Sequence, residues 1–180
     1  DELTTIFVAN AARIPFGTVT PEQAYDPTAV SLTYRNFGEV TINGIDLSLA
    51  YFPNEQWSLN GNYSYVDNTL FKNVDGIADV ALNAPGNKAK LGGSYAFRDL
   101  PLALGAQFRY VGSFRQDSGV YAGEVDSYAA LDLNLGYQLP LEHDLRLGMK
   151  VSNVLDNKYR TFVGAPEIGR LLFAQLATSF

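Results

Sequence analysis

The chain has 180 residues, no cysteine and a formal net charge of -6, which excludes a disulfide scaffold, a cysteine-based zinc site and thiol chemistry. An acidic chain without a clustered basic face also excludes nucleic acid as a partner. The 11 Tyr, 11 Phe and 16 Gly residues favour a β protein. No run of about 18 apolar residues is present, which excludes a transmembrane helix but leaves membrane-spanning strands possible.

The chain begins with a predicted strand over residues 3–14, which are rich in β-forming side chains. Residues 15–38 contain three prolines and several Gly, Asp and Asn residues, so they are predicted to form a long loop. A second strand follows, and its alternation is regular over residues 45–51. The pair Asn43 and Gly44 suggests a bulge at the start of that strand.

Six further strands alternate apolar and polar side chains with a period of two. They are predicted near residues 57–65, 89–97, 102–110, 131–139, 145–152 and 172–180. The strand at 145–152 is expected to run on through Asn153 to Asp156, and the final strand to end on Phe180. Each strand is close to the roughly 9 to 11 residues that a tilted membrane strand needs.

The predicted connections alternate between long and short. The first, third, fifth and seventh strands are followed by long connections, three of them at 15–38, 71–86 and 116–123 and the last centred on Gly164. The second, fourth and sixth strands are followed by short turns. This asymmetry is typical of an up-and-down outer-membrane barrel, which has short periplasmic turns and long extracellular loops.

The two faces of the predicted strands differ in composition. The apolar face carries an aromatic residue near the short turns, at Tyr51, Trp57, Phe97, Tyr137 and Phe180. Aromatic rings at one depth form the girdle expected at a membrane interface. The opposite face is small and polar, with charges at Asp46, Lys88, Lys90, Arg109, Asp132, Arg146 and Lys150. We therefore predict an all-β, antiparallel, up-and-down transmembrane β-barrel with eight strands and a wet or plugged lumen.

No catalytic, cofactor-binding or metal site is predicted, and the chain is not expected to be an enzyme. The single histidine, His143, lies in a short turn and has no predicted nucleophile within reach. Carboxylates gather in two long connections, at Asp117, Glu124 and Asp126 and at Asp75 and Asp79. Such clusters suit calcium or another hard cation, but they lack the EF-hand spacing, and solvated loop charge is the favoured interpretation.

The inward cations leave two interpretations open. Lys88, Lys90, Arg109 and Arg146 are able to contact an anionic substrate such as a ferric chelate. The favoured interpretation is that inward cations pair with the inward carboxylates Asp46 and Asp132, or with a plug inside the barrel. Ligand-binding residues are not assigned.

The end of the chain carries a motif, a loop and a terminal aromatic residue. These are Asn153, Leu155, Asp156 and Tyr159, then Gly164, Ala165 and Pro166, then Phe180. This region resembles the TonB-dependent outer-membrane receptors, a family of plugged transport barrels, although Val154-Leu155 stands where Leu-Phe is commoner. Residues 44–51 and 118–128 are also similar to that family.

The resemblance implies the C-terminal third of a larger barrel, because such receptors have about 22 strands around a plug. Residues 1–180 are accordingly expected to be a C-terminal barrel segment with no plug domain. The implied function is energy-dependent uptake of a nutrient such as a ferric chelate across the outer membrane of a Gram-negative bacterium.

The resemblance also implies partners but no cofactor. They are outer-membrane lipid, the remaining barrel strands and plug, a TonB-type energy-transducing protein reached through the plug, and the barrel-assembly machinery through the C-terminal strand. Two alternatives stay open. One is a self-contained eight-stranded outer-membrane barrel for anchoring or adhesion, closed by pairing 3–14 with the final strand. The other is a soluble β-barrel or sandwich whose apolar face is a core.

Overall fold

The computed structural model describes residues 2–9, 31–74, 78–118, 121–140 and 144–179, and these ranges are all-β. Its strands are β1 (Glu2–Ala9), β2 (Ser31–Glu39), β3 (Gly44–Tyr51), β4 (Trp57–Val66), β5 (Leu70–Val74), β6 (Ala78–Ala81), β7 (Asn87–Ala96), β8 (Leu102–Val111), β9 (Phe114–Ser118), β10 (Tyr121–Val125), β11 (Tyr128–Leu139), β12 (Asp144–Ser152) and β13 (Leu171–Ser179). No helix in the described ranges is long and apolar enough to cross a membrane.

The chain divides into two compact units, Asp1–Thr41 with Leu70–Val80, and Ile42–Thr69 with Ala81–Phe180. In the first unit, β1 pairs antiparallel with β2. The predicted first strand is therefore confirmed over Glu2–Ala9, and residues 10–14 lie outside the described part of the chain. The loop predicted over 15–38 is wrong from Ser31 onward, where β2 begins, because β-forming residues return after the last proline of that stretch and find a partner strand in β1.

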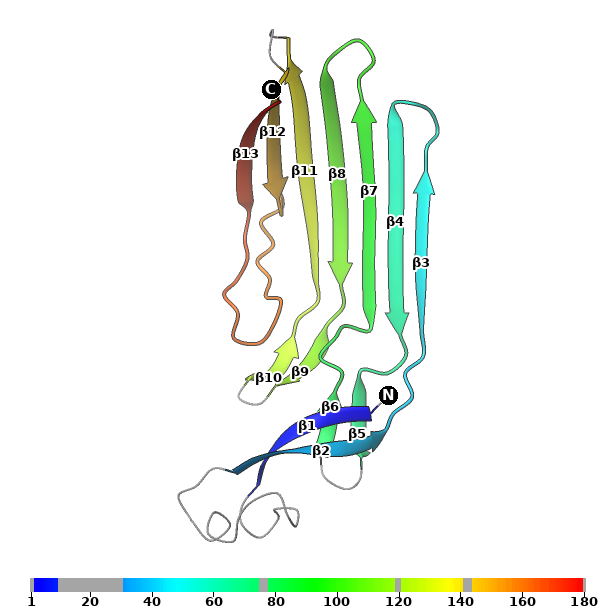
Figure 1. Ribbon diagram of the computed structural model, residues 1–180, viewed down its shortest axis with the longest axis vertical. Coiled ribbons are helices and arrows are strands. Elements are labelled where there is room, and N and C mark those ends of the chain that lie inside the picture. The colour runs from blue at the N-terminus through cyan, green and yellow to red at the C-terminus, as the bar shows by residue number, and fades with distance from the viewer. Residues whose placement is uncertain (1, 10–30, 75–77, 119–120, 141–143, 180) are drawn as a thin grey trace. The chain divides into compact units, whose positions relative to one another are not determined.

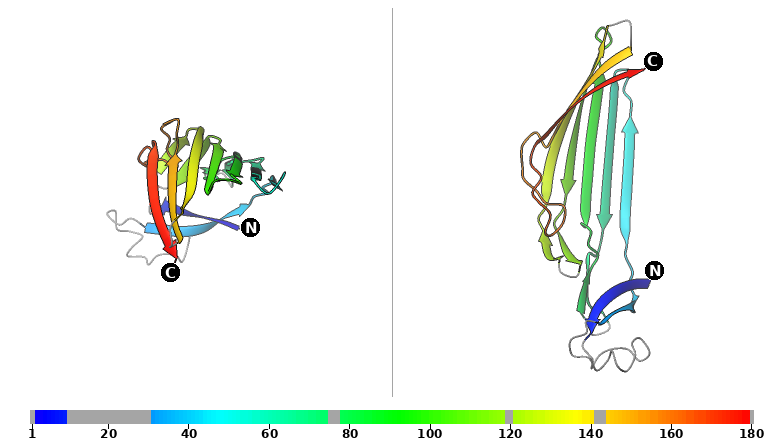
Figure 2. Two further views of the ribbon diagram at one scale, coloured as in Figure 1. Left: turned by 90° about the horizontal axis from the view of Figure 1, so that it is seen from above. Right: turned by 60° about the vertical axis from the view of Figure 1, so that its left-hand side comes forward.

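The second unit is built on a seven-stranded antiparallel sheet with the order β13-β12-β11-β8-β7-β4-β3 (Figure 1). The strands follow an arc when viewed end on (Figure 2). Strands adjacent in this sheet also follow one another along the chain, apart from short hairpins inserted in two connections, so the up-and-down antiparallel fold is confirmed. Eight barrel strands were expected, and the first of them, now β1, is not part of this sheet. It pairs with β2 in a separate two-stranded sheet.

The predicted alternation of short and long connections is confirmed within the seven-stranded sheet. Residues 52–56, 97–101 and 140–143 are the short connections, at one end of the sheet, and residues 112–127 and 153–170 are long connections at the other end (Figure 1). Residues 67–86, which include β5 and β6, are the long connection between β4 and β7. The long connections are more ordered than predicted, since β5 pairs with β6 in one and β9 with β10 in the next. Short antiparallel hairpins satisfy backbone groups that a loop would leave to water.

The register places the predicted apolar residues on one face. Leu91 lies opposite Phe108, and Leu133 lies opposite Val151. This face stays bare in the described part of the chain, with Leu91 61% and Leu176 63% exposed. A continuous bare apolar face is unfavourable in water but is the surface that a lipid bilayer solvates.

Aromatic rings cluster on this face near the short connections. The ring centroids of Trp57 and Tyr95 are 4.9 Å apart, and those of Tyr95 and Phe97 are 4.8 Å apart in an edge-on arrangement. Tyr51, on the neighbouring strand, is exposed. The predicted aromatic girdle is thus present at these positions, with Tyr95 added to it, and Phe180 lies outside the described residues.

The start of β3 is held by a clamp rather than by the suggested bulge. The pairing of β3 with β4 runs without interruption from Gly44 to Tyr51. The Asp67 carboxylate accepts hydrogen bonds from the backbone N–H and the side-chain Nδ2 of Asn43, at 3.1 and 2.9 Å. A Cβ on Gly44 would lie 2.6 Å from the Tyr65 backbone oxygen, so glycine is required at this close approach.

This clamp predicts a pH dependence. The hydrogen bonds from Asn43, the side-chain bond first, hold the pKa of the Asp67 carboxyl below its ordinary value. The clamp therefore stabilises this end of the hairpin fully above the ordinary aspartate pKa of about 4, and the stabilisation is lost as the pH falls through the lower folded value. We expect Asp67→Asn to speed amide exchange of residues 43–67 at pH 7. The ratio of mutant to wild-type exchange rates should fall towards one as the pH is lowered below about 4, and a constant ratio would contradict the prediction.

Candidate functional site

The face opposite the apolar surface is polar and closely packed. Asn60 lies across Gly92, where an added Cβ would come within 2.5 Å of the asparagine Oδ1. Asn134 lies across Gly105 in the same way, also at 2.5 Å. The amides thus lie flat over neighbouring strands, because glycine leaves room for them. We call this surface the inner face.

Cations gather on the inner face towards the long connections. Lys90 lies directly opposite Arg109 in the pairing of β7 with β8, and Lys88 follows two residues away on the same face. A hollow here is lined by Asn62, Ser64, Lys88, Ala89 and Lys90. Like charges at opposite positions repel, and the described residues include no ion pair to either lysine. This part of the inner face is therefore suited to an anion.

The buried carboxylate of Asp132 is the second inner-face feature. It lies 3.5 Å from Arg109 Nη2 and 3.8 Å from Lys150 Nζ. It also accepts a hydrogen bond from the backbone N–H of Asn153 at 3.0 Å. The predicted pairing of inward cations with Asp132 is confirmed for Arg109. The described residues show no ion pair to Asp46, the other inward carboxylate proposed as a partner.

The connection after β12 begins with a turn whose first residue, Asn153, is buried, so the expected strand over Asn153–Asp156 is wrong. Asn153 and Asp156 both have left-handed backbones, with φ of 53° and 57°, which ends the strand. Asn153 Nδ2 donates to the Asn157 carbonyl at 2.9 Å, and Asp156 Oδ1 accepts from the Arg170 N–H at 2.7 Å. Asn153 thus holds the first residues of this connection in a turn, and Asp156 ties them to Arg170 at its end. Asparagine and aspartate suit these positions because they tolerate the left-handed backbone and form hydrogen bonds with nearby main chain.

The middle of the same connection rests on aromatic rings. Tyr159 stacks on Tyr128 with centroids 4.0 Å apart and an interplanar angle of 11°. Tyr159 also forms a backbone bridge with Ile168 across the connection. Gly164 has φ of 87° and lies against Tyr121, where an added Cβ would approach the ring to 2.8 Å. Only glycine fits both this backbone and this contact.

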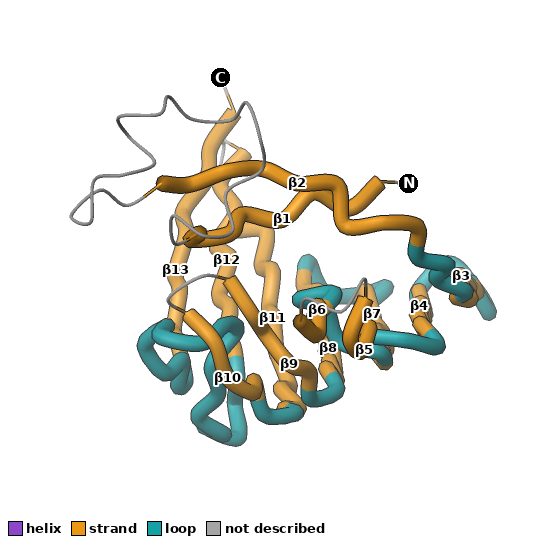
Figure 3. Tube along the Cα trace, turned by 90° about the horizontal axis from the view of Figure 1, so that it is seen from below, coloured by secondary structure: helices purple, strands orange, loops and turns teal. Residues whose placement is uncertain are grey.

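Hydrogen bonds tie the three long connections together. The Val163 N–H donates to Gln116 Oε1 at 2.9 Å. The next residue of β9, Asp117, donates its backbone N–H to Asn83 Oδ1 at 2.7 Å and accepts from Asn83 Nδ2 at 3.2 Å. Figure 3 views this end of the sheet, with β9 and β10 side by side. The central hairpin therefore joins the connection before β7 to the one after β12.

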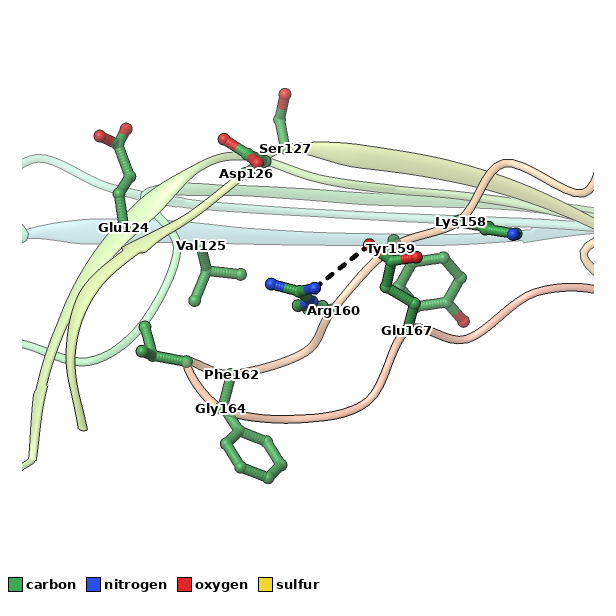
Figure 4. A pocket seen from close by; sticks show the side chains of 11 residues that line it. Glu124, Val125, Asp126, Ser127, Lys158, Tyr159, Arg160, Phe162, Gly164 and Glu167 are labelled. Carbon is green, nitrogen blue, oxygen red and sulfur yellow. Dashed lines mark hydrogen bonds and ion pairs between the residues drawn. The ribbon is translucent and has the colours of Figure 1, made fainter. Parts of the chain in front are cut away.

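These elements enclose a small hollow, which we call the rim hollow (Figure 4). Its lining residues are Glu124, Val125, Asp126, Ser127, Lys158, Tyr159, Arg160, Phe162, Val163, Gly164 and Glu167. Across it, Arg160 Nη2 and Glu167 Oε1 lie 3.3 Å apart. The hollow thus combines carboxylates, two cations and aromatic surface.

The predicted carboxylate clusters are only partly brought together. Glu124 and Asp126 both line the rim hollow, whereas Asp117 approaches Arg115 at 4.0 Å. Asp79 belongs to the other unit, and Asp75 and His143 lie outside the described residues. Within the described ranges, no group of three or more His, Asp or Glu side chains is arranged to hold a metal ion.

Several contacts of this region carry no signal in the sequence. The stacking of Tyr159 on Tyr128 and the bond between Gln116 and Val163 join positions far apart in the chain. Asn83 lies in the turn-rich stretch Leu82 to Asn87, which predicts a loop but not its partner. Such contacts depend on which connections the strand order places side by side.

The comparisons with known proteins agree with this architecture. Residues 10–154 match the family model described as "TonB dependent receptor-like, beta-barrel". The catecholate siderophore receptor Fiu of Escherichia coli K12 is 26% identical over 133 residues, which cover 71% of this chain and 17% of Fiu. The chain therefore spans less than a fifth of the length of this relative.

Solved structures share the fold at low sequence identity. The G324V mutant of the ferric enterobactin receptor PfeA of Pseudomonas aeruginosa aligns with a TM-score of 0.62 and 19% identity, over 84% of this chain and 24% of PfeA. The open form of Fiu from E. coli K12 aligns with a TM-score of 0.56 and 20% identity, over 74% of this chain and 20% of Fiu. The chain belongs to the TonB-dependent receptor family, and its seven-stranded sheet is part of an outer-membrane β-barrel.

Proposed function

We propose that the chain forms part of the barrel wall of a receptor for energy-dependent uptake of a ferric chelate. The observation that carries the proposal is the family match over residues 10–154, on a sheet with one lipid-facing side and one polar side. Fiu and PfeA, which share the fold, are named as receptors for ferric siderophores of the catecholate type and for ferric enterobactin. The proposed role is passive in chemistry, so the chain is not an enzyme.

The inner face supports an anionic cargo. Lys88 and Lys90 place two positive charges on β7, opposite Arg109 of β8, which also pairs with Asp132. The hollow beside the lysines also offers the Asn62 amide and the Ser64 hydroxyl. A ferric ion held by three catecholates carries a net negative charge. Cations together with hydrogen-bond donors are the groups that recognise such an oxygen-rich anion.

The proposal also assigns partners by way of the family. Residues 1–180 would lie in the C-terminal part of the receptor's barrel domain, beside its remaining strands and around a plug. A TonB-type protein would supply the energy through the plug, and the barrel-assembly machinery would insert the barrel through its C-terminal strand. Outer-membrane lipid would cover the apolar face that carries Leu91 and Leu176.

Charge removal on the inner face tests the proposed cargo. We expect the double variant Lys88→Gln, Lys90→Gln of the full-length receptor to bind a ferric tris-catecholate complex about tenfold more weakly, because two exposed cations each contribute up to about 1 kcal/mol. Binding of a neutral ferric tris-hydroxamate complex should change much less. Both affinities are measured by titration with radioactive iron complexes.

The control for this experiment is Arg98→Gln, which removes an exposed cation near the short connections, where Arg98 lies 3.8 Å from Glu55. The affinity of the Arg98→Gln variant for both complexes should equal that of the wild type. If the two lysine substitutions leave the affinity for the anionic complex unchanged, this part of the inner face is not on the cargo's route. If the wild-type receptor binds and imports neither ferric complex, the proposed function itself is wrong.

A further inference from the structure

Asp132 lies in β11, and its carboxylate contacts β8, β12 and the connection after β12. It accepts from Arg109 of β8 and lies beside Lys150 of β12, which flank it diagonally on the two neighbouring strands. The same oxygen that faces Arg109 also accepts the N–H of Asn153, the first residue of the connection after β12. The residue is only 6% exposed.

The buried position makes this carboxylate a fixed anchor. A carboxylate removed from water is strongly unfavourable unless cations and hydrogen-bond donors replace the lost hydration. Arg109 and Lys150 supply the positive charge, and Asn153 supplies a charge-assisted backbone hydrogen bond at 3.0 Å. Movement of the turn at Asn153 would remove one of these partners, so the carboxylate and the turn hold each other in place.

The anchored turn leads directly into the wall of the rim hollow. Asn153 is 1% exposed and holds the Asn157 carbonyl, one residue before Lys158. The neighbouring Val154 N–H donates to the Leu131 carbonyl at 2.8 Å. Farther along, Tyr159 rests on Tyr128 of the same strand as Asp132. One edge of the hollow is therefore attached to β11, and Asp132 provides the charged part of the attachment.

We infer that Asp132 is a positioning residue for the rim hollow. It does not line the hollow, but its carboxylate fixes the turn that precedes Lys158, Tyr159 and Arg160, which line the hollow. The inference goes beyond the proposed function, because it concerns how the hollow is held whatever cargo enters. Asn153, a residue of the motif that resembles the family, is thereby hydrogen-bonded to Asp132 of β11.

Hydrogen exchange on the full-length receptor in detergent micelles tests this inference. The variant Asp132→Asn preserves shape but removes the charge. We expect amides of residues 153–170 to exchange at least about tenfold faster, because a neutral amide accepts the Asn153 hydrogen bond more weakly than a carboxylate and leaves Arg109 and Lys150 without their counter-charge. Peptides from the β3–β4 hairpin, residues 44–66, should keep their wild-type exchange. An equal rise in both segments, or a change below about threefold in residues 153–170, would overturn the inference.

Two matched variants separate positioning from general charge effects. Asp46→Asn removes a carboxylate from the same inner face, and Asp46 has no ion pair among the described residues; exchange of 153–170 should be unchanged. Lys150→Gln removes one cation but leaves the bond from Asn153 to Asp132, so it should have a much smaller effect than Asp132→Asn. If Lys150→Gln matches Asp132→Asn, the carboxylate acts only by balancing charge and the inference fails.

Discussion

An arginine in place of Leu91 is expected to destabilise the barrel by about 2–4 kcal/mol, the cost of a cation near the middle of a lipid-facing strand. Leu91 lies in the centre of β7, opposite Phe108 on the apolar face, and is 61% exposed. In lipid its side chain would meet hydrocarbon, where a guanidinium finds neither water nor a counter-charge. Chemical unfolding of the full-length receptor in lipid vesicles measures the effect.

The control for this experiment is Ser94→Arg on the same strand. Ser94 lies opposite Gly105 on the inner face and is exposed, so an arginine there should reach water and cost less than about 1 kcal/mol. The difference between the two variants reports which side of the sheet faces lipid. Equal effects of the two substitutions would contradict the assigned orientation.

Replacing Asn153 by alanine is expected to cost about 2–3 kcal/mol. Alanine in a left-handed backbone costs roughly 1–2 kcal/mol, and loss of the bond to the Asn157 carbonyl costs about 1 kcal/mol more. Asn153 Oδ1 is buried without a hydrogen-bond partner among the described residues, so its removal offsets a small part of the lost stability. Unfolding of the full-length receptor and hydrogen exchange of residues 153–170 measure the loss.

The variant Asn153→Gly separates the two contributions. Glycine adopts the same φ without strain, so only the side-chain hydrogen bond and packing are lost, and the cost should fall to about 1 kcal/mol. If glycine is as costly as alanine, the backbone conformation at Asn153 contributes nothing. If both variants are as stable as the wild type, the motif asparagine does not hold this turn.

The strands and their faces are predictable from local patterns. A period of two places Leu91, Leu133 and Leu176 on one face whatever the partner strand, and the structure has them there. Short polar turns also mark hairpins reliably, since such connections leave neighbouring strands only the antiparallel arrangement. The strands at 31–39, 70–74, 78–81, 114–118 and 121–125 are not predicted from the sequence, because irregular or turn-rich stretches hide short strands whose partners are not apparent locally.

The site region was predictable in its charges but not in its contacts. Alternation alone places Arg109 and Asp132 on the inner face, and opposite charges on one face favour pairing. The turn at Asn153 was predicted as strand, because its left-handed backbone depends on a buried hydrogen bond to Asn157 and on the Asp132 carboxylate. Neither partner is recognisable from the residues that surround Asn153 in the chain.

By itself, therefore, the sequence determined the β architecture, the lipid-facing and inner faces, the alternation of short and long connections, and the resemblance to a receptor family. These follow from side-chain periodicity and turn chemistry, which act over a few residues. Only the tertiary structure decided that β1 pairs with β2, that Asp132 anchors the connection after β12, and that Gln116 and Asn83 tie the long connections together. Those contacts join distant segments, and strand order and register alone bring them within hydrogen-bond distance.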